Sequence, residues 1–136
     1  MSTVDFTSWA TGDLNLTLGD RTYPVRPPSV EGMATVLAAA ALAEIQLGAA
    51  EGPLPADLQE LLDAIPPGTS PSLGDQYGRL IEDGIDRVTL DRMAFYATFY
   101  WARGKETAQA MAVLFWSAQD ADTEVPEDGA EPAPKG

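Results

Sequence analysis

The sequence contains no cysteine and no histidine among its 136 residues. Without cysteine the chain cannot form a disulfide or a thiolate metal site. Without histidine it lacks the commonest general base and the commonest metal ligand, which excludes Ser-His and Cys-His catalysis, zinc fingers and haem ligation by histidine. Together these absences predict a protein that is not an enzyme and needs no metal or cofactor.

Positive charge is also scarce, because 8 basic residues stand against 21 acidic ones and give a formal net charge of −13 at pH 7. This balance has the wrong sign for binding nucleic acid or an anionic membrane. Long hydrophobic runs are missing as well: the alanine-rich stretch at residues 38–43 is short and is followed by Glu44, which favours a packed helix over a membrane span. The first residues lack the basic start and apolar core of a signal peptide. We therefore expect a soluble cytoplasmic protein.

The length and the composition predict one domain followed by a tail. A chain of 136 residues is long enough for one independent hydrophobic core. Apolar periodicity predicts a mainly α fold over residues 1–118, a small helical domain of about four to five helices with an N-terminal β-hairpin. Residues 119–136 hold six acidic residues, three prolines and no aromatic residue, so a disordered acidic tail is predicted there.

A hairpin is the clearest local prediction. Residues 14–18 alternate between leucine and polar residues, Gly19 and Asp20 supply a turn, and residues 22–25 return as a second strand. The leucine face of the first strand is predicted to pack on the helices, because an isolated hairpin is only marginally stable in water. Residues 3–9, which precede the hairpin, are predicted to form a short helical turn with an aromatic anchor.

Five helices follow in the sequence pattern. The first predicted helix runs from Val30 to Leu47, the second carries the apolar residues Leu58 to Ile65, and the third carries Leu73 to Ile81. The fourth contains the aromatic residues and ends at Gly104, and the fifth begins at about Lys105. Ser29 is the predicted N-cap of the first helix and Thr89 that of the aromatic helix. Val88 and Met93 then occupy the positions of a hydrophobic staple. Ile85 is placed to close a Schellman contact after the third helix.

The helix that ends before Gly104 is unusually rich in aromatic residues. At 100° per residue, Met93 and Tyr96 lie on one face and Phe95 and Phe99 lie nearly opposite. A helix with apolar residues all round either is the central helix of the fold or turns one face toward a partner. The central position is the favoured interpretation, with some aromatic side chains reaching the surface as interface anchors. The candidate partner-binding residues are Phe95, Phe99, Trp101, Phe115 and Trp116.

Three stretches carry a resemblance to a known family. They read LNLTLGDRTYPVRPPS at residues 14–29, LGDQYGRLIEDGI at residues 73–85, and YWARGKETAQAMAVLFW at residues 100–116. With a short opening segment, an alanine-rich helix and an acidic tail around them, the chain resembles the small tail assembly chaperones of actinobacterial siphophages. The likeness covers about residues 3–117.

The resemblance implies a function without catalysis. Chaperones of this type bind the long helical tape measure protein in the host cytoplasm, help recruit tail tube subunits around it, and leave before the tail matures, so the protein is not expected in the virion. The family has no catalytic residues or cofactors to transfer, and a homo-oligomer is compatible with the sequence. Such chaperones are often made as two products through a programmed −1 frameshift, and residues 133–135 admit a slippery codon choice. The chain would then be the short product.

Two alternatives remain open at this point. The protein could instead be a structural component of a phage virion, such as a minor tail protein or a head-tail connector. It could also be an unrelated acidic adaptor or an antitoxin-like regulator. Presence in purified virions would distinguish a structural protein from a chaperone.

Overall fold

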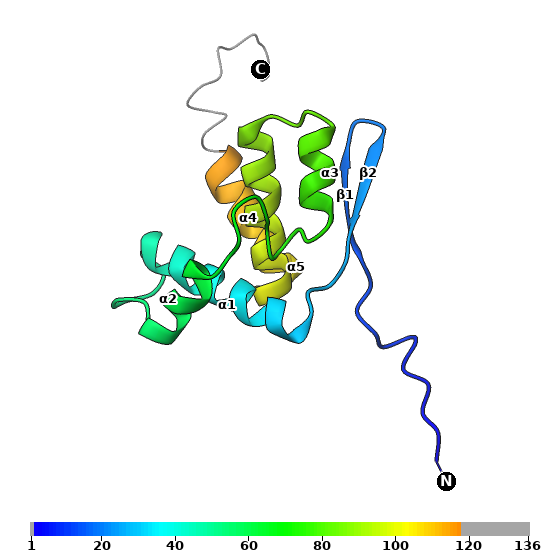
Figure 1. Cartoon of the computed structure of the whole chain (residues 1–136), viewed down its shortest axis with the longest axis horizontal. Coiled ribbons are helices and arrows are strands. Elements are labelled where there is room, and N and C mark those ends of the chain that lie inside the picture. Colours follow the sequence, from blue (N-terminus) through cyan, green and yellow to red (C-terminus); the bar gives the residue numbers. More distant parts are fainter. Residues whose placement is uncertain (1, 118–136) are drawn as a thin grey trace.

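The computed structural model describes residues 2–117 and shows a mainly α fold with an N-terminal hairpin, as predicted (Figure 1). The elements in this part of the chain are β1 (Leu14–Leu18), β2 (Arg21–Val25), α1 (Val30–Gln46), α2 (Ala56–Asp63), α3 (Gln76–Glu82), α4 (Arg87–Arg103), α5 (Lys105–Ala112) and the π-helical turn η1 (Val113–Ser117). The tail predicted at residues 119–136 lies outside the described residues. None of the described helices is long and apolar enough to cross a membrane.

The hairpin forms where the alternating pattern predicts it. Its facing pairs are Leu14–Val25, Asn15–Pro24, Leu16–Tyr23, Thr17–Thr22 and Leu18–Arg21. Gly19 lies in the turn with a φ of 64°, a conformation that glycine adopts without steric cost. Leu14 is buried and Leu16 packs against the same hydrophobic cluster, but Leu18 is 40% exposed. The predicted packing of the leucine face is therefore right for Leu14 and Leu16 and wrong for Leu18, which lies beside the turn and outside that cluster.

Two of the predicted helix ends are confirmed in detail. The Ser29 hydroxyl accepts a hydrogen bond of 3.0 Å from the backbone N–H of Gly32 and caps α1. After α3, the N–H of Gly84 donates to the carbonyl of Ile81 and the N–H of Ile85 donates to the carbonyl of Leu80. These two bonds form the predicted Schellman motif.

The predicted N-cap of α4 is wrong. Asp86 caps this helix, with its carboxylate accepting a hydrogen bond of 2.9 Å from the backbone N–H of Thr89. Thr89 is therefore the third helical residue, and the staple positions belong to Ile85 and Leu90, which both contribute to a hydrophobic cluster. Val88, the residue predicted for the staple, is 60% exposed.

The opening segment and α2 also differ from the predictions. Residues 3–9 contain no helix, and only a turn at residues 7–9 is present. Within α2 no residue is fully buried, and the helix ends at Asp63, so Ile65 lies beyond it. The helix α2 lies against α1 and keeps Leu58, Leu61 and Leu62 half-buried. Residues 3–9 are all exposed, and burial of an apolar face is what stabilises most short helices.

The hydrophobic core has two parts, one on each side of α4. The first cluster joins the hairpin, the segment before α3, α3 and α4 through the buried residues Leu14, Tyr23, Val25, Leu73, Leu80, Leu90 and Ala97. The second joins α1, α4 and α5 through Ala40, Phe99 and Ala108. Tyr96 and Tyr100 pack against both clusters. The interpretation of the aromatic helix as the central helix is therefore confirmed.

Candidate functional site

The five candidate aromatic residues lie in three different environments. Phe99 is 1% exposed and belongs to the second core cluster, beside Ala40 and Ala108. Its ring packs against Phe95 at a centroid distance of 4.9 Å. Because its side chain is enclosed by α1, α4 and α5, Phe99 acts in the core and has no surface to offer a partner.

Trp101 also has a structural role. It packs against the first cluster, and its indole Nε1–H donates a hydrogen bond of 3.0 Å to the backbone carbonyl of Ser72. The Ser72 hydroxyl in turn donates to the carbonyl of Ala94 at 3.1 Å. These bonds tie the segment before α3 to α4, so the polar end of this indole is already satisfied within the fold.

The other three candidates come together at the surface. The ring of Phe95 lies 6.4 Å from that of Phe115 and 6.1 Å from that of Trp116, both in edge-on arrangements. Phe115 and Trp116 lie on η1, which continues α5 directly beyond Ala112, and α5 packs along α4. All three side chains are partly buried. We call this cluster of Phe95, Phe115 and Trp116 the aromatic patch.

Charge and apolar side chains surround the aromatic patch. The guanidinium of Arg92 lies 5.6 Å from the centroid of the Trp116 ring, a distance at which a cation is attracted by the face of an indole. A shallow hollow of about 270 Å³ opens between Val88, Arg92 and the patch. Nearby on η1, Val113 and Leu114 are 64% and 62% exposed. Exposed apolar side chains therefore lie both at the rim of this hollow and on η1, at the C-terminal end of the described residues.

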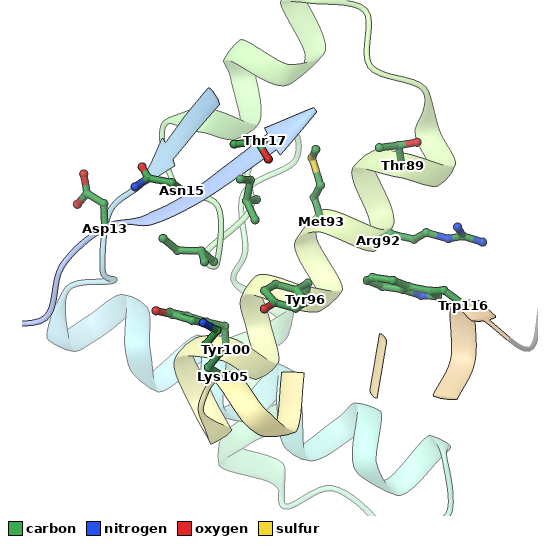
Figure 2. A pocket seen from close by; sticks show the side chains of 12 residues that line it. Asp13, Asn15, Thr17, Thr89, Arg92, Met93, Tyr96, Tyr100, Lys105 and Trp116 are labelled. Carbon is green, nitrogen blue, oxygen red and sulfur yellow. The ribbon is translucent and has the colours of Figure 1, made fainter. Parts of the chain in front are cut away.

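A groove lies on the other side of Trp116, between β1 and α4 (Figure 2). Its volume is about 520 Å³. Its lining residues are Asp13, Leu14, Asn15, Leu16, Thr17, Thr89, Arg92, Met93, Tyr96, Tyr100, Lys105 and Trp116. We call it the β1–α4 groove. One wall is a strand edge, and the opposite wall is the α4 face that carries Met93 and Tyr96.

Local sequence patterns indicate neither the β1–α4 groove nor the exposure of the aromatic residues that precede β1. The groove exists only because β1 packs beside α4, and no local pattern gives the distance between two such elements. Phe6 and Trp9 were predicted as an anchor, but they are 63% and 68% exposed. Large aromatic side chains are usually buried at least in part, so no local pattern signals the exposure of these two.

Two carboxyl groups with lowered pKa values, those of Glu44 and Asp86, stabilise helices of the fold. Arg103 donates to the carboxylate of Glu44, which lowers the pKa of that carboxyl group. The N–H of Thr89 lowers the pKa of Asp86, the cap of α4. Neither group lines the groove or the hollow. Within residues 2–117 no three acidic side chains gather in a way that would hold a metal ion.

Comparison with known proteins gives one family. The family model DUF7426, described as a domain of unknown function, matches residues 4–136. No curated protein and no solved structure matches the chain. The function of this chain is therefore to be inferred from its own residues.

Proposed function

We propose that this chain, which belongs to the DUF7426 family, is a phage tail assembly chaperone that binds the tape measure protein and helps recruit tail tube subunits. The proposal starts from the resemblance of residues 3–117 to chaperones of this type. The observation that carries it is the aromatic patch, with exposed Val113 and Leu114 beside it. A long helical protein presents apolar stripes along its length, and an apolar patch of this kind is suited to hold one of them.

The charge of the chain fits a chaperone that keeps another protein soluble. With a net charge of −13, several copies bound along one partner repel each other and repel other loaded complexes. The same charge opposes contact with nucleic acid and anionic membranes. In this proposal the protein acts in the host cytoplasm, performs no catalysis, uses no cofactor and is absent from the mature virion.

The first experiment measures binding to a tape measure fragment encoded near this gene. Trp116→Ala is expected to raise the dissociation constant about 30-fold, the effect of removing an interface anchor worth roughly 2 kcal/mol. Trp101 is unsuitable for this test, because its substitution would also break the hydrogen bond to Ser72.

The matched control is Val30→Ala. Val30 is 91% exposed and lies at the start of α1, so its truncation removes exposed apolar surface away from the patch and should leave affinity unchanged. Circular dichroism of both variants verifies folding. Full affinity of a folded Trp116→Ala variant would contradict binding through the aromatic patch.

The alternative function is that of a structural protein of the virion, either a minor tail protein or a head-tail connector. Mass spectrometry of purified particles separates the two functions. A chaperone is absent from the particles, whereas a structural protein is present at a fixed number of copies.

A further inference from the structure

An exposed aromatic segment precedes the hairpin. Figure 1 shows that this part of the chain leaves β1 and extends away from the helices. Within it Val4, Phe6 and Trp9 are 63%, 63% and 68% exposed. We call residues 2–12 the aromatic arm. Three large apolar side chains exposed within six positions are unusual for a chain that remains alone in water.

Hydrogen bonds and a ring contact within the aromatic arm fix its local conformation. The Asp5 carboxylate accepts hydrogen bonds from the backbone N–H of Thr7 at 2.9 Å and from its hydroxyl at 2.6 Å. The N–H of Trp9 donates to the carbonyl of Phe6 at 2.9 Å. The two rings meet edge to face, with centroids 5.2 Å apart. A segment with its aromatic pair already in place loses less conformational entropy when it binds.

The β1–α4 groove has properties that match those of the arm. The side of β1 away from β2 has no strand partner among residues 2–117, and residues 13–17 line the groove without a gap. Across from this edge lie Met93 and Tyr96, with Tyr100 and Lys105 at one end and Arg92 and Trp116 at the other (Figure 2). A thioether and aromatic rings are favourable neighbours for further aromatic side chains.

The charges of the arm and of the groove, and the point at which the arm joins β1, indicate which molecule fills the groove. The arm carries Asp5, and the groove is lined by the two cations Arg92 and Lys105 and by one acidic residue, Asp13, which gives it a net positive charge. The arm joins β1 at Asp13, which lines the groove, and extends away from the helices (Figure 1). An arm that filled its own groove would have to reverse its direction at this junction, whereas the arm of another copy has no such constraint.

We propose that the aromatic arm of one copy docks in the β1–α4 groove of a second copy, and that reciprocal exchange produces a two-fold symmetric dimer. The area fits a reversible dimer. A fully exposed aromatic side chain can bury roughly 150–250 Å², and Phe6 and Trp9 are about two thirds exposed, so together they can bury about 200–330 Å² and cover a similar area of the groove. Two such contacts bury about 800–1,300 Å² in total, at the lower end of the range for specific interfaces. This inference does not rest on the proposed function.

The first experiment measures the oligomeric state of the full chain by sedimentation equilibrium. The unaltered protein is expected to be a dimer in reversible equilibrium with monomer. The double variant Phe6→Ala with Trp9→Ala is expected to raise the dissociation constant of the dimer at least about 30-fold. The control Val30→Ala removes a more exposed apolar side chain outside the arm and the groove, and it should leave the constant unchanged.

The second experiment locates the arm. Because the chain has no cysteine, single cysteines can be introduced without competing thiols. Ser8 lies in the arm and Thr17 lines the groove, and both are exposed. A mixture of Ser8→Cys and Thr17→Cys chains is expected to form a covalent heterodimer on mild oxidation. A mixture of Ser8→Cys with Ala50→Cys, on the loop after α1, is expected to form far less.

Three results would overturn the proposal. The first is an unaltered protein that stays monomeric up to millimolar concentration. The second is a dimer whose dissociation constant is the same in the arm variant. The third is a chain carrying both Ser8→Cys and Thr17→Cys that closes its disulfide within one molecule at high dilution, which would place the arm in its own groove. Loss of tape measure binding in these variants would not bear on the dimer.

Discussion

Tyr23 connects the hairpin to the helices through a single side chain. Its ring is 1% exposed in the first core cluster, and its hydroxyl donates a hydrogen bond of 2.7 Å to the Oδ2 atom of Asp83 at the end of α3. Arg21, on the same strand, reaches the same residue, with its Nη1 atom 3.8 Å from Oδ2 of Asp83. The alternating pattern of the strand assigns Tyr23 to the buried face, and the same side chain also supplies a polar contact between the hairpin and α3.

Tyr23→Phe is expected to lower the free energy of unfolding by about 1–2 kcal/mol. The substitution keeps the ring but leaves the partly buried Asp83 carboxylate without its nearest donor, and hydrogen bonds to charged groups lie at the upper end of the usual range. Urea unfolding followed by circular dichroism measures the change.

Tyr77→Phe is the matched control. Tyr77 is also packed against the first cluster, but its hydroxyl has no hydrogen-bond partner within residues 2–117. Its loss should change stability by no more than a few tenths of a kcal/mol, well below the effect at Tyr23. An equal effect at the two positions would contradict a special role for the Tyr23–Asp83 bond.

Residue by residue, the sequence predicts some caps and misses others for a physical reason. Ser29 follows two prolines and precedes a long apolar pattern, so no nearby residue competes with it as a cap. Before α4, Asp86 and Thr89 are both good caps. The choice between them depends on burying Ile85 and Leu90 in the first cluster, and a contact among distant elements cannot be read from a local pattern.

At the scale of elements, α1 and α4 are joined by a two-pronged ion pair. Arg103 Nη2 donates to Glu44 Oε1 and Arg103 Nε donates to Oε2, both at 2.8 Å. The side chains are only 34% and 23% exposed. Arg103 lies in the last turn of α4, where a positive charge also interacts favourably with the helix dipole.

The contribution of this ion pair depends on pH in a defined direction. Arg103 holds the pKa of Glu44 below its ordinary value, so the folded state favours the ionised carboxylate. The stabilisation is complete above the pKa of the unfolded chain, about 4.3, and is lost as the pH falls through the lower pKa of the folded state. Glu44→Gln is expected to cost about 0.5–1 kcal/mol at pH 7 and nearly nothing at pH 2.5.

Urea unfolding at the two pH values measures this difference. The control is Glu60→Gln on the exposed surface of α2, where residues 2–117 supply no ion-pair partner, and this variant should match the unaltered protein at both pH values. A cost of Glu44→Gln that stays the same at pH 2.5 would show that the ion pair is not its source.

The elements themselves were largely predictable, but the candidate site was not. Alternation and a glycine turn define the hairpin, and glycines and prolines mark most helix ends. The aromatic patch was predicted in part, because Phe95, Phe115 and Trp116 were candidates, but Phe99 was not distinguished from them. All four are aromatic residues on helical segments, and only the packing of α1 and α5 determines which ring is enclosed. The β1–α4 groove depends on the docking of the hairpin and has no counterpart in local sequence.

At the scale of the whole molecule, α4 makes the two core clusters one cooperative unit. One face of the helix contributes Leu90 and Ala97 to the first cluster, and another contributes Phe99 to the second. If the elements of either cluster leave α4, the apolar side chains that α4 contributes to that cluster become exposed to water. We therefore expect the hairpin and α5 to unfold in the same transition, although they share no cluster.

Leu80→Ala tests whether the two clusters unfold together, because it weakens the first cluster only. Leu80 is fully buried in the first cluster, so its truncation is expected to lower the free energy of unfolding by about 2–5 kcal/mol. If the two clusters unfold together, the slowest-exchanging amides of α1 and α5 must lose the same free energy, although these helices pack in the second cluster around Phe99. Native-state hydrogen exchange measures the loss at each amide.

Val113→Ala, at a position that is 64% exposed, is the control and should leave exchange in α1 unchanged. Unaltered protection of α1 in Leu80→Ala would mean that the second cluster persists alone, because α4 would then stay folded against α1 after the hairpin and α3 had left it.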